Sequence, residues 1–124
     1  MKQSAQARGQ SLEALYDLAR VQFAADDYAK SRAACRALMA KDRNAMLSDL
    51  CMARAFLVWR RASRAAEYVA SALAKAPNDP DVILADADLK RVSGELAASK
   101  AAYQRLLAID PRNPDAQFGL AQSY

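Results

Sequence analysis

The stretch APNDPD occupies residues 76–81, and a closely similar stretch, DPRNPD, occupies residues 110–115. Together they contain all four prolines of the 124-residue chain, and Pro111 and Pro114 repeat the order and spacing of Pro77 and Pro80. Proline at the first position of a helix is favourable, because the N–H that it lacks would have no helical partner there. Each stretch therefore predicts the end of one helix, a turn, and the start of the next helix.

The residues beside these prolines support the same prediction. Asp79 and Asn113, which precede the second proline of each stretch, are typical N-cap residues. Asp81 and Asp115 follow in the first helical turn, where a carboxylate complements the helix dipole. The stretch KDRNAM, around Arg43, precedes APNDPD by about the same number of residues that separates APNDPD from DPRNPD. It is expected to form the same kind of corner, although it contains no proline. We therefore expect corners between helices at a constant step along the chain.

The composition favours an all-α protein of one domain. Hydrophobic residues make up 53% of the chain and charged residues 26%, which is typical of a globular domain of this length. Glycine occurs only three times, and strand-like alternating runs of valine, isoleucine and threonine are absent. No apolar stretch approaches the roughly 18 residues that a membrane-spanning helix needs.

Apolar residues recur at helical spacing between the corners, and a shorter break divides each interval into two helices. These breaks are AADDY, WRRAS and VSGEL. We predict seven helices, at about residues 11–25, 28–41, 45–59, 63–75, 80–92, 95–108 and 114–123. Residues 1–10 lack the pattern and are expected to form a flexible tail.

The pairs of helices at this constant step resemble the tetratricopeptide repeat, a helix–turn–helix unit of about 34 residues. The pattern of that family is W-x2-L-G-x2-Y, then A-x3-F, then P. The third unit corresponds with Ile83, Asp86, Ala87 and Lys90, followed by Ser99, Tyr103 and Pro111. The small residue of the first helix recurs in register at Ala19, Ala53, Ala87 and Ala121. Small side chains let paired helices pack closely, and the second helices match them with Ser31, Ala65 and Ser99.

The resemblance covers residues 12–124 and implies a right-handed superhelix, or α-solenoid, of antiparallel helix pairs. It implies about three and a half units, at about residues 12–45, 46–79 and 80–113, with the first helix of a fourth at 114–124. Because the partner of that last helix is missing, we expect the chain to be part of a longer protein.

Several polar residues stand where the family has large apolar ones, namely Gln22, Asp49, Asp86, Lys90 and Gln117. We expect such side chains to reach water at the helix ends. Asp86 is the most unusual, because its neighbours in register are apolar. We expect it either to pair with Lys90, one turn further on, or to mark a unit that packs differently.

The two cysteines, Cys35 and Cys51, are too few for a disulfide framework, and without histidine they do not form a zinc site. The favoured interpretation is two reduced, buried thiols that pack as small hydrophobic residues. A disulfide between neighbouring helices is the alternative. The chain shows no secretory signal, so we expect a cytoplasmic location, a prediction that means nothing if the chain is an internal fragment.

No group of residues indicates catalysis. The absence of histidine removes the commonest general base and metal ligand. No phosphate-binding loop, nucleophile elbow or CxxC motif is present. We therefore predict a protein that is not an enzyme and that holds no cofactor or metal.

The resemblance implies a concave groove, lined by the first helix of each pair, that binds a peptide or helix of a partner protein. We predict a non-enzymatic scaffold for protein–protein interaction. The residues expected to line the groove are Tyr16, Arg20, Phe23, Leu50, Arg54, Leu57, Leu84, Asp88, Arg91, Phe118 and Gln122.

Some family members grip the C-terminal carboxylate of chaperones with lysine and arginine on these same helices. The corresponding places here hold Tyr16, Arg20, Cys51, Asp81 and Ala85. Only Arg20 is basic, and the carboxylate of Asp81 would repel a peptide carboxylate. We therefore expect no clamp for a chaperone C-terminus.

Two other functions stay open. Residues 1–76 carry 13 basic and 7 acidic side chains, against 5 and 7 in residues 77–124, so the chain could associate head to tail with itself. The basic half could also bind RNA or an acidic partner, although no unit has a regular base-reading pair. The residues that would do so are Lys30, Arg32, Arg36, Arg60, Arg61 and Arg64, with Trp59 as a stacking ring.

Overall fold

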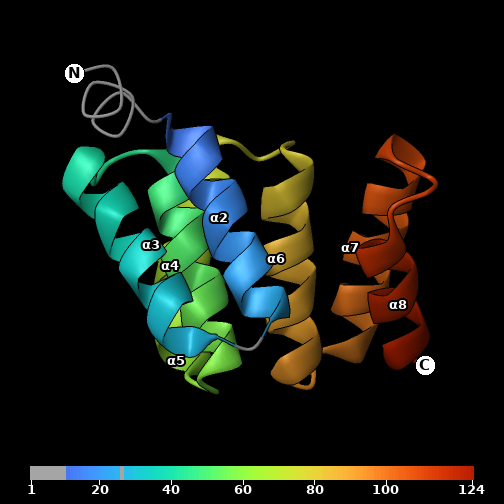
Figure 1. Ribbon diagram of the computed structural model, residues 1–124. Coiled ribbons are helices and arrows are strands. Elements are labelled where there is room, and N and C mark those ends of the chain that lie inside the picture. The colour runs from blue at the N-terminus through green and yellow to red at the C-terminus, as the bar shows by residue number, and fades with distance from the viewer. Residues whose placement is uncertain (1–10, 26) are drawn as a thin grey trace.

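The computed structural model describes residues 11–25 and 27–124, so the predicted tail of residues 1–10 lies outside the described residues. Seven helices and no strand occur in the described part (Figure 1). They are α2 (Leu12–Ala24), α3 (Tyr28–Lys41), α4 (Met46–Val58), α5 (Ala62–Lys75), α6 (Pro80–Val92), α7 (Leu96–Ile109) and α8 (Pro114–Gln122). The predicted all-α class is confirmed, and the predicted helix ends agree to within one residue. None of the described helices is long and apolar enough to cross a membrane.

The helices form antiparallel pairs, α2–α3, α4–α5 and α6–α7, which stack side by side from one end of the molecule to the other (Figure 1). The first helices of successive pairs contact one another, from α2 to α4, from α4 to α6 and from α6 to α8. Each second helix also packs on the first helix of the next pair. This stacking is the solenoid arrangement that the repeat implies.

The turns inside the last two complete pairs have the same geometry. Arg60, after α4, and Gly94, after α6, have φ values of 61° and 82°. The next N–H in each turn, of Arg61 or Glu95, donates to a carbonyl five residues earlier at 2.8 Å. A left-handed residue followed by this hydrogen bond satisfies carbonyls that the helix end leaves free.

The corners between pairs are capped as the prolines predict. The Asp79 carboxylate accepts from the N–H groups of Asp81 and Val82, and the Asn113 side chain accepts from the N–H of Ala116. Ser11 has the same role at α2, where it accepts from the N–H of Ala14. At α4 the N-cap is Ala45, which provides no side-chain hydrogen bond.

Small side chains fill the contact inside each pair. Ala19, Ala53 and Ala87 are fully buried, and so are the matching residues of the second helices, Ser31, Ala65 and Ser99. Ala121 is exposed on α8, because no second helix of the described chain packs against that face. A larger side chain at Ala53 would separate α4 from α5.

Two of the unusual acids are paired. Lys90 donates to the Asp86 carboxylate at 2.8 Å. The expectation that Asp86 pairs with Lys90 is therefore confirmed. The expectation that Asp49 reaches water is wrong, because this side chain is only 5% exposed. Its carboxylate accepts from Ser71 at 2.7 Å and from Lys75 at 2.6 Å, and this joins the start of α4 to the end of α5.

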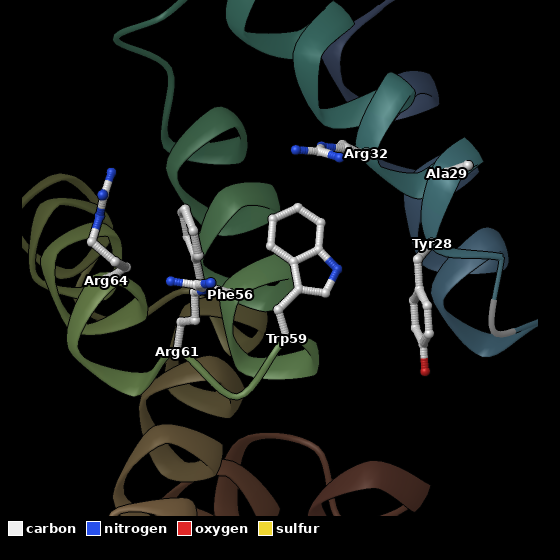
Figure 2. A pocket seen from close by; sticks show the side chains of 7 residues that line it. All are labelled: Tyr28, Ala29, Arg32, Phe56, Trp59, Arg61 and Arg64. Atoms are coloured by element: carbon white, nitrogen blue, oxygen red, sulfur yellow. The ribbon is translucent and has the colours of Figure 1, made fainter.

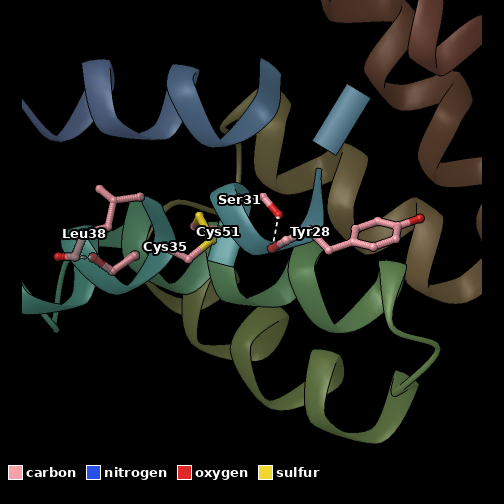
Figure 3. The surroundings of a disulfide bond; sticks show 6 residues. Tyr28, Ser31, Cys35, Leu38 and Cys51 are labelled. Carbon is pink, nitrogen blue, oxygen red and sulfur yellow. Dashed lines mark hydrogen bonds between the residues drawn. A yellow bond between two sulfur atoms is a disulfide. The ribbon is translucent and has the colours of Figure 1, made fainter. Parts of the chain in front are cut away.

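Cys35 on α3 and Cys51 on α4 form a disulfide (Figure 3). The favoured interpretation of two reduced thiols is therefore wrong, although both residues are buried as expected. Their Cα atoms lie 5.5 Å apart, because α3 packs directly on α4 at the boundary between the first two pairs. The bond thus links neighbouring units and not the helices of one unit.

Buried apolar side chains gather in two clusters. The first extends from α2 to α6 and includes Leu38, Leu50 and Val69. The second joins α6, α7 and α8 around Tyr103 and Leu106. Helix α6 contributes to both clusters, because it packs on α4 and α5 on one side and on α7 and α8 on the other.

Candidate functional site

A groove of about 240 Å³ lies across the first helices of the pairs, between α2, α4 and α6. The lining residues of α4 and α6 occupy identical positions in successive units, so the repeat itself builds the groove. The lining residues are Phe23 from α2, Arg54, Leu57 and Val58 from α4, and Asp88, Arg91 and Val92 from α6.

Arg54 is the central charge of this groove. Its guanidinium interacts with the carboxylates of Asp88, Asp81 and Asp115, which come from α6 and α8. Burial acts to lower the pKa of the half-buried Arg54. The Tyr16 phenol and the surrounding carboxylates outweigh burial, so that this pKa lies above its ordinary value and Arg54 stays charged.

Tyr16 carries a buried polar atom without a partner. The residue is 2% exposed, and within the described chain its hydroxyl makes no hydrogen bond of normal geometry, although the Arg54 guanidinium lies close to it. Burial raises the pKa of Tyr16 to about 12, and the nearby Arg54 guanidinium opposes that rise. Buried hydroxyl groups in native proteins are nearly always hydrogen-bonded, so this one requires an explanation.

A hydrogen-bonded group holds the α6 side of the groove in place. The Tyr103 hydroxyl on α7 donates to Asp88 and accepts from Arg91 Nε at 3.1 Å. Burial raises the pKa of the Asp88 carboxyl, while the Tyr103 hydrogen bond and Arg54 act to lower it. From the sequence, Tyr103 was predicted only as a packing position. Tyrosine where the repeat has phenylalanine was the available signal, because a buried hydroxyl needs a partner.

The structure brings together five of the predicted groove residues, namely Phe23, Arg54, Leu57, Asp88 and Arg91. Three predicted residues are corrected, because they lie in the hydrophobic core and not in the groove lining. Tyr16, Leu50 and Leu84 are 2%, 0% and 3% exposed. Helices α4 and α6 are covered on several sides, so residues next to the groove face still pack inward.

The remaining predicted residues are exposed but do not line the groove. Arg20 is exposed on α2 and forms a 3.7 Å ion pair with Asp17. Phe118 and Gln122 are exposed on α8, and 64% of Phe118 is accessible. Whether any of these residues contacts a ligand stays a prediction.

The charges divide the groove into two sides. Arg20 and Arg54 belong to α2 and α4, whereas Asp81, Asp88 and Asp115 belong to α6 and α8. Arg91 also lies on α6, but the Asp88 carboxylate and the Tyr103 hydroxyl engage it. No group of histidine, cysteine or acidic residues in the described chain could hold a metal ion.

No protein-family model matches the chain, and no curated protein is similar to it. Solved structures do match. The first tetratricopeptide domain of Spaghetti (RPAP3), bound to the HSP90 peptide SRMEEVD, aligns with a TM-score of 0.71 and 18% identity, over 92% of this chain and 93% of that chain. The chain has the tetratricopeptide-repeat fold. The second such domain of human RPAP3, in complex with the HSP70 peptide SGPTIEEVD, gives a TM-score of 0.65 and 17% identity, over 88% of this chain and 91% of that one.

The first domain of human RPAP3 has the same tetratricopeptide fold, with a TM-score of 0.70 and 17% identity, over 90% of this chain and 88% of that chain. Two of these three structures contain chaperone peptides. The sequence-based expectation of no chaperone-tail clamp is therefore not supported by these comparisons. In this chain two of the positions that correspond to the chaperone clamp are not accessible to a peptide. Cys51 forms the disulfide, and Ala85 is buried.

Proposed function

We propose that the protein is an interaction module that binds a short peptide of a partner protein in the groove between α2, α4 and α6. The tetratricopeptide fold supports this proposal, and so do the peptides bound to similar domains. The observation that carries it is the charged Arg54 guanidinium, which lines the groove beside apolar side chains. A peptide carbonyl or carboxylate in the groove would accept a hydrogen bond from the Arg54 guanidinium.

The basic and acidic sides of the groove determine which peptide side chains fit it. An acidic side chain fits the side of Arg20 and Arg54, and a basic side chain fits the side of Asp81 and Asp115. Between them the groove offers the apolar surfaces of Phe23, Leu57 and Val92. The preferred ligand is therefore a peptide with an acid, a base and one apolar residue between or beside them.

Binding of the fluorescently labelled peptide SRMEEVD, followed by anisotropy, tests this proposal. SRMEEVD contains an arginine, a methionine and three acids, whereas SGPTIEEVD has no basic side chain. We expect SRMEEVD to bind more tightly. Arg54→Gln should weaken its binding at least tenfold, because a hydrogen bond to a charged group contributes about 1.5–3 kcal/mol. Arg112→Gln, which changes an exposed arginine outside the groove, is the matched control and should bind as the unchanged protein does.

Tyr16→Phe separates binding from folding. Removal of the buried hydroxyl should raise the free energy of unfolding by about 1 kcal/mol, because it relieves an unsatisfied polar group. The same substitution should leave SRMEEVD binding unchanged, because the buried hydroxyl does not line the groove. Equal binding by Arg54→Gln and the unchanged protein would contradict the groove as the peptide site.

The cellular location also remains a proposal. A cytoplasmic location was the expectation from the sequence, whereas the Cys35–Cys51 disulfide favours an oxidising compartment. We infer the oxidising compartment. Alkylation of acid-trapped cellular protein should find both thiols blocked, and free thiols would restore the cytoplasmic expectation.

A further inference from the structure

A second and larger cavity, of about 610 Å³, lies away from the groove, in the cleft between α3 and α5 (Figure 2). Helix α4 forms its floor, and a smaller cavity of about 180 Å³ continues it along α3 towards Arg36. We call this region the α3–α5 cleft. Tyr28 and Arg32 come from α3, Phe56 from α4 and Arg64 from α5. Trp59, the C-cap of α4, and Arg61, the N-cap of α5, complete the principal lining.

The repeat does not require these side chains. At the corresponding places of the next unit, Phe56 becomes Lys90 and Trp59 becomes Ser93. Arg61 likewise becomes Glu95. Both units nevertheless have the same turn and the same helix pairing. The aromatic and basic lining therefore belongs to this one cleft and is not a by-product of stacking.

Interactions within the cleft hold its guanidinium groups against aromatic rings. The Arg32 guanidinium lies 5.3 Å from the Trp59 ring centre, and the Arg64 guanidinium lies 5.2 Å from that of Phe56. Tyr68 stacks on Phe56 with ring centres 5.7 Å apart. Figure 2 shows Trp59 between the α3 residues on one side and Arg61 and Arg64 on the other. Arginine over an aromatic face keeps N–H groups available for a planar anion.

The charge of the cleft is strongly positive. Glu67 is the carboxylate that pairs with Arg64, at 3.3 Å, and both side chains are well exposed. Within the described chain, Arg32 and Arg61 have no carboxylate partner. Guanidinium forks bind carboxylates through two parallel hydrogen bonds, so an anionic ligand complements this surface.

The aromatic rings distinguish between two anionic ligands. RNA bases bind by stacking on free aromatic faces. Here Arg64 and Tyr68 contact the faces of Phe56, and Arg32 covers Trp59. The rings therefore favour an inserted side chain over a stacked base. A cavity of about 610 Å³ is large enough for a few side chains of a peptide.

We propose that the α3–α5 cleft is a second binding site, which takes an acidic segment of a partner protein. Carboxylates of that segment pair with Arg32, Arg61 and Arg64, and one aromatic or aliphatic side chain inserts between Tyr28 and Trp59. The site is separate from the groove, so the protein can hold two peptide segments at once.

Trp59 makes the test specific, because it is the single tryptophan of the chain and its emission reports on this cleft. The probe is the capped peptide EEFEE, titrated against the protein while the tryptophan spectrum is recorded. We expect a saturable spectral change that weakens as salt rises, because exposed ion pairs are screened. The matched peptide QQFQQ, which has the same size without charge, should bind at least tenfold more weakly.

Two double variants with the same change in net charge provide the controls. Arg61→Glu with Arg64→Glu should weaken EEFEE binding at least tenfold. Arg43→Glu with Arg112→Glu, which changes two exposed arginines in corner turns far from the cleft, should leave it within about twofold. Both variants should keep the helical circular dichroism spectrum. Binding of SRMEEVD in the groove should also persist in both, so the two sites succeed or fail separately.

Three results would overturn the proposal. A stronger change with oligouridylate than with EEFEE would assign the cleft to nucleic acid. A change on raising protein concentration alone, without any peptide, would assign it to self-association. Equal EEFEE binding by the two double variants, or no change with any probe, would show that the cleft is not a binding site.

Discussion

Arg60 holds a left-handed backbone conformation, with φ at 61°, where L residues are strained. Gly94 occupies the same place in the next unit and adopts that conformation without strain. We expect Arg60→Gly to raise the free energy of unfolding by about 0.5–1 kcal/mol, because relief of strain exceeds the entropy that glycine adds to the unfolded chain. Urea unfolding followed by circular dichroism measures this difference.

Gly94→Ala is the reciprocal control. No atom lies within 4 Å of the added methyl group, so any loss of stability must come from the backbone. We expect a loss of about 1 kcal/mol. If both substitutions left the urea midpoint unchanged, strain in this turn would be negligible.

Side-chain partners could be predicted only where they are close in sequence. The Asp86–Lys90 pair follows from positions one helical turn apart. The partners of Asp49 could not be predicted, because Lys75 is 26 residues away and approaches only when α5 folds back on α4. The partner of Tyr103 could not be predicted either, because Asp88 is 15 residues away and approaches only when α7 folds back on α6.

Helix α4 lacks the side-chain N-cap that the first helices of the other units possess. At the starts of α2, α6 and α8, the side chains of the N-cap residues Ser11, Asp79 and Asn113 accept backbone N–H hydrogen bonds. The N-cap residue of α4 is Ala45, whose side chain cannot accept such a bond. Ala45 already has the extended backbone of an N-cap, so a new side chain needs no rearrangement. We expect Ala45→Asp to raise the free energy of unfolding by about 1 kcal/mol. Thermal unfolding measures the gain, and Ala45→Val, which cannot accept a hydrogen bond, should give none.

Helix positions were predictable because their signals are local, namely the prolines, the caps and the constant register between units. Burial within a helix was less predictable. Leu50 and Leu84 have a periodicity that fits a groove face, yet both are buried, because α4 and α6 contact helices on several sides. The groove was therefore predicted as a region, and only part of its lining was predicted residue by residue.

For the whole molecule, the disulfide is the strongest single link between units. It joins residues 16 positions apart, and closure of a loop of about 15 residues contributes ~3 kcal/mol through the unfolded state. We expect a reducing agent to lower the free energy of unfolding by about that amount. Urea unfolding with and without dithiothreitol measures the effect. A variant with both Cys35→Ala and Cys51→Ala should be insensitive to the reagent, and an equally large response in that variant would contradict the role of the disulfide.

The hydrophobic core of the molecule is divided into two clusters, and α6 contributes residues to both. The disulfide lies wholly in the first cluster, so the second, around α7 and α8, depends on noncovalent contacts alone. Local opening follows such lines of weaker cohesion. We therefore expect helices α7 and α8 to open locally while the N-terminal helices, which carry the α3–α5 cleft, keep their shape.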